Sequence, residues 1–175
     1  MLQRERPRVV VKADLLPSVT VASTIGMAGI PIGWLWAQLA PGRKAIITSA
    51  GTPTPFELAS WHSFDALVIF ALLLLGAGVF IGALTWLLRE RRGPVVMFAA
   101  VAGSLLSGWL AMLMGKAFLG DTYTITEPPK IGDVITLAPE IATTWVIIVQ
   151  PLAVAVVYAL LAAWNGRDDL GRRLA

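Results

Sequence analysis

Uncharged, mostly apolar residues occur along the chain in four long runs, separated by shorter segments that carry nearly all the charge. An α-helix needs about 20 apolar residues to cross a hydrocarbon core of roughly 30 Å, and each run is longer than that. The pattern therefore predicts an all-α membrane protein with four transmembrane helices. The predicted spans are residues 17–40, 66–88, 94–115 and 141–164.

Composition supports this assignment and limits the number of domains. The chain has 175 residues, of which 57% are hydrophobic and only 14% are charged, outside the range of ordinary soluble domains. The segments outside the spans are too short to form a separate catalytic module, so residues 1–175 are expected to form one transmembrane domain. The chain has no cysteine, which excludes disulfides, thiolate metal sites and iron–sulfur ligation.

Basic residues are distributed unequally between the two sides of the predicted membrane domain. They are concentrated before the first span, between the second and third, and after the fourth, which predicts that both termini lie in the cytoplasm. The same distribution explains the positive net charge without nucleic-acid binding. The basic residues on this side are Arg4, Arg6, Arg8, Lys12, Arg89, Arg91, Arg92, Arg167, Arg172 and Arg173, against Arg43, Lys44, Lys116 and Lys130 on the other.

Tryptophans near the ends of the spans are typical of residues anchored at the headgroup level. Trp86 and Trp164 fall at predicted inner ends, and Trp34, Trp36 and Trp145 fall at outer ends. All five are therefore expected to face the membrane interface.

The two outward connections are longer than the inward one and contain possible extended segments. The β-branched residues of 46–48, followed by the Gly- and Pro-containing segment 51–55, predict a short strand and a turn. Residues 123–126 are a second candidate for extended structure, and Pro128 and Pro129 then block regular structure. The two connections are expected to pack together as a small outer cap.

Every span contains small residues at helical spacing, and small residues allow transmembrane helices to approach closely. Such a face can serve packing within the bundle or contact with a partner protein, and the sequence leaves both open. The candidate helix-packing or partner-contact residues are Gly29, Gly33, Gly78, Gly82, Gly103, Gly108, Ala155 and Ala159.

Two prolines inside spans suggest discontinuous helices, which line substrate sites in some transporters. They are Pro31 in the first span and Pro151, preceded by Gln150, in the fourth. No acid, base or second polar group lies near either proline in the sequence, so a simple kink is the favoured interpretation. Gln150 is expected to hydrogen-bond to another helix, with a transport role as the alternative.

His62 is the only histidine, and Glu57 and Asp65 are close to it in sequence. A general base or a metal contact at the outer surface is conceivable for this group. One histidine without cysteine cannot supply a bis-histidine haem or a three-ligand zinc site. We therefore interpret His62 as an interfacial anchor and Asp65 as a helix-end residue, and we predict no catalytic residue, metal or cofactor beyond structural lipids.

The chain resembles a family of small four-span actinobacterial membrane proteins catalogued as a domain of unknown function. The resemblance covers most of the chain and implies a plasma-membrane location, but it supplies no activity and no site residues. The matching parts of the sequence are residues 34–36, 39–41, His62 with Phe64, 91–94, 141–144, Pro151, 158–161 and the Asp-Asp-Leu-Gly segment 168–171.

These features favour a non-catalytic accessory or structural subunit of a larger actinobacterial plasma-membrane complex. A respiratory-chain supercomplex is the host considered most plausible, because such electron-transport assemblies contain small helical subunits without cofactors. The first alternative is a small carrier or channel that uses the kinked first and fourth spans. The second is a membrane enzyme with a histidine–carboxylate site at the outer surface.

Overall fold

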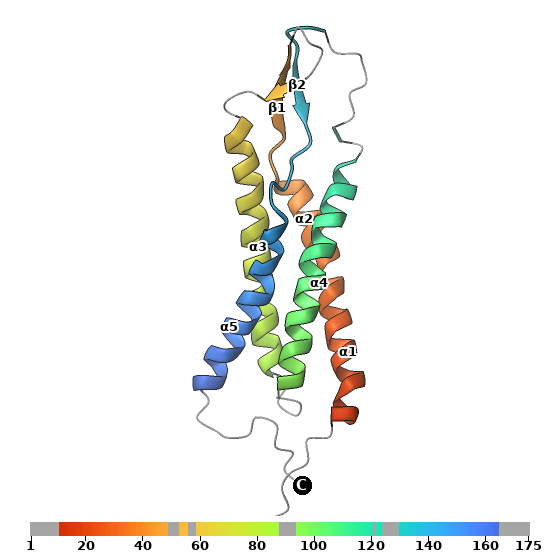
Figure 1. Ribbon diagram of the computed structural model, residues 1–175, viewed down its shortest axis with the longest axis vertical. Helices are drawn as coiled ribbons and strands as arrows, with labels where there is room; N and C mark the ends of the chain where they lie inside the picture. The colour runs from red at the N-terminus through yellow and green to blue at the C-terminus, as the bar shows by residue number, and fades with distance from the viewer. Residues whose placement is uncertain are drawn as a thin grey trace, which may run out of the picture.

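A computed structural model describes residues 11–48, 53–55, 59–87, 94–120, 122–123 and 130–164, without the side chains of 11–17, 53–55 and 59–62. Among these residues, four helical segments are long and apolar enough to cross a membrane, and they run side by side (Figure 1). They are Ser18–Leu39, Ser63–Leu87, Pro94–Leu119 and Thr144–Trp164. The predicted four-helix membrane fold is thus confirmed.

The first span consists of two helices, α1 at Val11–Met27 and α2 at Gly29–Leu39. They meet at Ala28, whose amide donates to the carbonyl of Ile25 in a tighter turn (3.1 Å). Pro31 lies in the first turn of α2, where backbone N–H groups have no partner within the helix. The proline therefore removes no hydrogen bond of α2, and the break falls before it.

The fourth span also changes its helix type near a proline. It begins with the 3₁₀ helix η2 at Thr144–Ile148 and continues as α5 at Val149–Trp164. Pro151 lies in the first turn of α5, the same position that Pro31 has in α2. Both expected kinks are therefore junctions between helical segments, located a few residues before the proline.

The two middle spans are single helices, α3 at Ala59–Leu87 and α4 at Pro94–Leu119. The first begins earlier than predicted and the second ends later, since Asp65 and Lys116 are both helical. A charged residue ends an apolar run but does not end a helix, because near the membrane surface its side chain reaches water. Pro94 starts α4, where the fixed φ of proline suits the first helical position.

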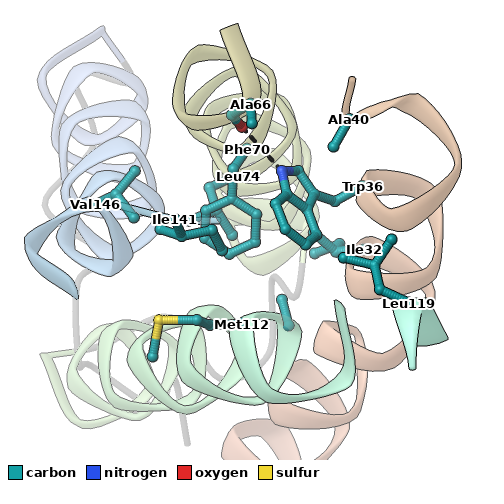
Figure 2. Packing of buried hydrophobic residues seen from close by; sticks show 11 residues of the cluster. Ile32, Trp36, Ala40, Ala66, Phe70, Leu74, Met112, Leu119, Ile141 and Val146 are labelled. Atoms are coloured by element: carbon teal, nitrogen blue, oxygen red, sulfur yellow. Dashed lines mark hydrogen bonds between the residues drawn. The ribbon is translucent and has the colours of Figure 1, made fainter. Parts of the chain in front are cut away.

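The helices pack mainly as two pairs, with α1 and α2 along α4 and with α3 along α5 (Figure 1). The main apolar core joins both pairs in the half of the bundle near the sheet (Figure 2). A smaller cluster of Ile81, Ala100 and Val154 joins α3, α4 and α5 closer to the other end. The buried residues of the main core are Ile32, Trp36, Ala40, Ala66, Phe70, Leu74, Ala111, Met112, Leu119, Ile141 and Val146.

Trp36 lies at the centre of this core. Its indole is fully buried, and its Nε1–H donates to the carbonyl oxygen of Ala66 on α3 at 2.9 Å (Figure 2). Its ring meets that of Phe70 edge to face, with centroids 5.8 Å apart. Trp86 is also buried and stacks edge to face with Tyr158. Bundle atoms cover both rings, so these two tryptophans pack within the chain, which their positions near span ends do not reveal.

The two connections predicted to face outward contribute strands to one antiparallel sheet with the strand order β2-β1-β3. β1 is Arg43–Ile47, β2 is Pro53–Pro55 and β3 is Val134–Leu137. The expected strand near 46–48 is therefore present, and the two connections do pair with each other. Of the second candidate segment, 123–126, Tyr123 lies in a turn and residues 124–126 lie outside the described residues; the strand of this connection that pairs with β1 is β3.

The sheet extends beyond one end of the bundle, and the first residues of α1 and the last residues of α5 lie at the opposite end (Figure 1). The end of α3 and the start of α4 lie there too. The connections that contain the strands β1, β2 and β3 therefore lie on one side of the apolar region.

Candidate functional site

A cluster of polar side chains lies inside the bundle where α4 meets α5. Gln150, in the first turn of α5, is fully buried, and its Nε2–H donates to the Oγ of Ser107 on α4 at 3.2 Å. Ser104, one helical turn earlier on α4, is fully buried as well. These residues form the polar cluster, which contains no ionisable group.

Two atoms of the polar cluster, Oε1 of Gln150 and Oγ of Ser104, have no hydrogen-bond partner within the described part of the chain. A buried polar group left in this state costs about 1–3 kcal/mol. Pro151 follows Gln150 and has no N–H to donate to the carbonyl of Ile147. That carbonyl lies against Gly108, where an added Cβ would be 3.2 Å from it.

The chemistry available to the polar cluster is limited to hydrogen bonding with neutral groups. Without a carboxylate, an amine or an imidazole it has no charge to hold an ion and no group to pass a proton near neutral pH. Thr85, the nearest comparable hydroxyl on α3, donates to the carbonyl of Ile81 in its own helix at 2.8 Å. The arrangement matches the expected interhelical hydrogen bond of Gln150.

At the end of the bundle that carries the sheet, Arg43 joins the two connections to each other. Its Nε–H donates to the carbonyl of Ala138 at 3.1 Å, and its guanidinium lies 3.0 Å from the Glu140 carboxylate. Glu140 is more than half exposed, so the ion pair is worth no more than about 1 kcal/mol. The pair therefore orients the base of the sheet and is poorly suited to catalysis.

The histidine–carboxylate group predicted at the outer surface is only partly described. The backbone of His62 lies in the first turns of α3, but its side chain and all of Glu57 lie outside the described residues. Asp65 is exposed on α3. Among the described residues, no three His, Cys, Asp or Glu side chains gather in a way that holds a metal ion.

The six candidate glycines are all in helix–helix contacts. Gly29 and Gly33 face α4, where an added Cβ of Gly33 would lie 2.5 Å from the carbonyl of Ala111. Gly78 and Gly82 face α5, Gly103 faces Ala22 of α1, and Gly108 faces Ile147. Of the two candidate alanines, Ala155 is half-buried and Ala159 is exposed. The glycine faces thus serve packing within the chain.

The outside of the helical bundle carries large apolar side chains. Their exposure is expected for a surface that meets lipid or another membrane protein. Trp34, Trp145 and Trp164 are exposed near helix ends, as predicted from the sequence. Other exposed examples are Leu72, Phe80 and Leu87 on α3, Phe98, Leu106 and Trp109 on α4, and Leu152, Val156 and Leu160 on α5.

Sequence reasoning named Gln150 but not its partners. Ser104 and Ser107 were not among the named candidates, although two serines three positions apart in an uncharged span are a signal for hydrogen bonding between helices. The pairing of Arg43 with Glu140 was missed because the expected packing of the two connections does not tell which of their side chains meet. Both omissions concern contacts between distant segments.

Comparison with known proteins places the chain among mycobacterial relatives. It is 32% identical over 179 aligned positions to the uncharacterized protein ML1222 of Mycobacterium leprae, covering 89% of each chain. It is 32% identical over 169 positions to the uncharacterized protein Rv1591 of Mycobacterium tuberculosis, covering 84% of this chain and 86% of that one. No solved structure matches.

A family model covers nearly the whole described bundle. The family described as "Protein of unknown function (DUF2567)" matches residues 25–172, which include most of the first span, the sheet and all later spans. This match agrees with the resemblance found in the sequence. The chain belongs to the DUF2567 family of actinobacterial four-helix membrane proteins.

Proposed function

We propose that this protein is a non-catalytic subunit of a larger plasma-membrane assembly, in which it holds a partner through its outer surface. The observation that carries the proposal is the complete burial of Gln150, the most polar side chain at mid-depth in the bundle. A carrier needs such a group in a water-accessible cavity, whereas here it is bonded to Ser107. Polar chemistry inside the bundle is thus used to join helices.

The distribution of exposed side chains supports the same proposal. The candidate glycines are in contacts within the chain, so the bundle is held together without a partner. What remains on the outside is a wide apolar surface on α3, α4 and α5, and a sheet that extends beyond it. Such a surface suits binding of lipids and of other transmembrane helices.

The proposed orientation has both termini in the cytoplasm. Both described chain ends, the end of α3 and the start of α4 lie at one end of the bundle, and the sequence near that end carries most of the lysine and arginine residues. By the positive-inside rule this end faces the cytoplasm, and the sheet then lies on the outer side. A partner therefore meets helices within the membrane and the sheet outside it.

The proposal is tested by purifying the tagged full-length chain from native membranes in mild detergent and identifying partners by quantitative mass spectrometry. We expect one or a few integral-membrane proteins in fixed stoichiometry with the chain. A respiratory-chain supercomplex is the more specific host that we propose, and the same experiment tests it. Recovery of the chain without any stoichiometric protein would contradict the proposal.

A carrier is the second candidate, and one observation favours it. Gln150 Oε1 and Ser104 Oγ are both buried without a partner in the described residues, which are two places where a neutral hydrogen-bonding solute can bind. Reconstitution into liposomes separates the two functions. Solute flux that is lost in Gln150→Leu would support a carrier, whereas the subunit proposal expects no flux above that of empty liposomes.

A further inference from the structure

The two outer edges of the sheet differ in their backbone chemistry. β2 is Pro53-Thr54-Pro55, and its prolines lie opposite Ile47 and Ala45 of β1. Proline has no N–H, so this edge is poorly able to accept another strand. β3 is Val134-Ile135-Thr136-Leu137, which contains neither proline nor a charged residue. Natural sheets protect edges with proline or charge, and only one edge of this sheet has that protection.

A bulge fixes the register of β3 against β1. Gly132 has a φ of 94°, its amide donates to the carbonyl of Ile47 at 2.9 Å, and the amide of Ile47 donates to the carbonyl of Asp133 at 3.1 Å. Two hydrogen bonds close the turn at residues 130–133. The backbone amide of Asp133 donates to the carbonyl of Lys130 at 3.0 Å, and the Asp133 carboxylate accepts from the backbone amide of Lys130. Glycine favours this positive φ, so the register is firmly set.

The register determines which backbone groups of β3 point away from β1. In an antiparallel ladder, alternate residues direct both N–H and C=O to the same side. Ile47 bonds toward β3, so Ala45 and Arg43 do the same, and their partners Ile135 and Leu137 point back toward β1. The N–H and C=O groups of Val134 and Thr136 therefore point outward, where none of the residues that the structure describes bonds to them.

The side chains around this edge are also open to an approaching chain. Ile131 is 70% exposed and Val134 is 60% exposed, and Thr136 is exposed as well. The sheet extends past the end of the bundle (Figure 1), so the strand β3, which Val134 begins, lies beyond the hydrophobic length of the spans. Contact with lipid tails therefore does not account for the exposure of these side chains, whereas a bound polypeptide would cover them.

We propose that the outer edge of β3 binds an extended peptide segment of a different membrane protein, which adds to the sheet as a fourth strand. The backbone groups of Val134 and Thr136 supply the hydrogen bonds, and apolar side chains of the added strand cover Val134 and Ile131. Strand addition of this kind takes its affinity from the main chain and its specificity from alternate side chains. This inference rests on the proposed subunit function and names the contact outside the membrane.

A second copy of this chain does not suit this edge. Two copies inserted in the same orientation are related by rotation about the membrane normal, and β3 runs roughly along that direction (Figure 1). The rotation would place each outward N–H against the same N–H of the other copy at equal height. Parallel strands need donors opposite acceptors, so the added strand comes from a different chain.

Amide hydrogen exchange tests the proposal with a pattern that capture of a protein alone does not give. In the full-length chain isolated in detergent, we expect fast exchange at Val134 and Thr136 and slow exchange at Ile135 and Leu137. In the complex purified from native membranes, we expect exchange at Val134 and Thr136 to slow at least tenfold. Only a strand added at this edge protects that alternating pair.

A proline variant and a matched control test the same hydrogen bonds. Thr136→Pro removes one outward N–H and leaves the β1–β3 ladder donors in place, whereas Thr136→Val keeps the N–H and the shape of the side chain. We expect Thr136→Pro to lower recovery of the partner at least tenfold and Thr136→Val to keep it within twofold. Slow exchange at Ile135 and Leu137 in the proline variant verifies that its sheet is intact. If this slow exchange is lost, the exchange pattern of the wild-type complex tests the proposal instead.

The outcomes separate this inference from the proposed function. Fast exchange at Val134 and Thr136 in a complex that contains a partner would overturn the inference and leave the subunit function standing. Full partner recovery with a folded Thr136→Pro variant would do the same. A photo-crosslink from position 136 to a second copy of this chain would overturn the choice of occupant. Absence of any stoichiometric partner would overturn both proposals.

Discussion

At the scale of single residues, the interior of this protein uses its few polar and aromatic side chains to fix helices against one another. Trp36 joins α2 to α3 through a hydrogen bond to Ala66 and a ring contact with Phe70. Gln150 joins α5 to α4 through Ser107. Because no water reaches these buried polar groups, each contact gives them a hydrogen-bond partner from the protein. These residues are therefore expected to matter for stability.

Substitution of Trp36 tests the importance of its buried indole. Trp36→Phe removes the donor to Ala66 and leaves a space beside Gly115, whose added Cβ would lie 2.6 Å from the ring. We expect the free energy of unfolding to fall by about 1–3 kcal/mol. Denaturation in detergent micelles, followed by circular dichroism, measures the change. Trp34→Phe is the control, because Trp34 is about half exposed; an equal loss in both variants would contradict the account.

Substitution of Gln150 tests whether the polar cluster is a joint between helices. Gln150→Leu removes the bond to Ser107 but also removes the unpartnered Oε1, so the two effects partly cancel. We expect a change in the free energy of unfolding within about 1 kcal/mol. Ser107→Ala should cost at least as much, because it leaves the Gln150 amide buried without its acceptor. A loss above about 3 kcal/mol in Gln150→Leu alone would indicate a more extensive polar network.

At the scale of elements, the bundle consists of two closely packed helix pairs joined by a shared core. Glycines let α3 approach α5 and let α2 approach α4, so that backbone atoms of one helix lie against the other. This packing explains why small residues occur at helical spacing in the spans. The contacts near the sheet are the larger part of the core. They include buried residues of α2, α3, α4 and η2, with Val149 of α5 packed against them.

Two glycines of α3 provide a matched test of this packing. An added Cβ at Gly78 would lie 2.6 Å from the Gln150 carbonyl and 2.7 Å from the Cβ of Ala153, whereas one at Gly76 would meet nothing within 4 Å. We expect Gly78→Ala to lower the free energy of unfolding by about 1–3 kcal/mol. Gly76→Ala should be neutral or slightly stabilising, by less than about 1 kcal/mol. Detergent denaturation of both variants measures the difference, and equal effects would be incompatible with the α3–α5 contact.

Much of this architecture could be predicted from the sequence, because it depends on local composition. The four spans follow from runs of apolar residues, and β1 follows from the β-branched residues near Ile46. The contacts between segments could not be predicted, because they depend on which faces meet. The strand β3 forms because β1 is available to pair with it, and Trp36 is buried because α3 offers the Ala66 carbonyl. Sequence position alone suggested the membrane interface for this tryptophan.

At the scale of the whole molecule, a closed and largely apolar bundle carries a small sheet at one end (Figure 1). The described residues place no ionisable group in the middle of a span and gather no metal ligands. The surfaces left for function are the apolar outside of the helices and the unprotected edge of β3. Both surfaces suit binding of another polypeptide, which is why we propose that the protein belongs to a larger assembly.

The most direct test of this central claim is the mass of the particle that contains the chain when it is extracted gently from its native membrane. Native mass spectrometry resolves the 18.7 kDa chain, its bound lipids and any protein partners. The account expects a particle in which the chain and at least one different integral-membrane protein occur in fixed stoichiometry. A particle that consists only of this chain and lipids, under conditions that preserve other membrane complexes from the same cells, would contradict it.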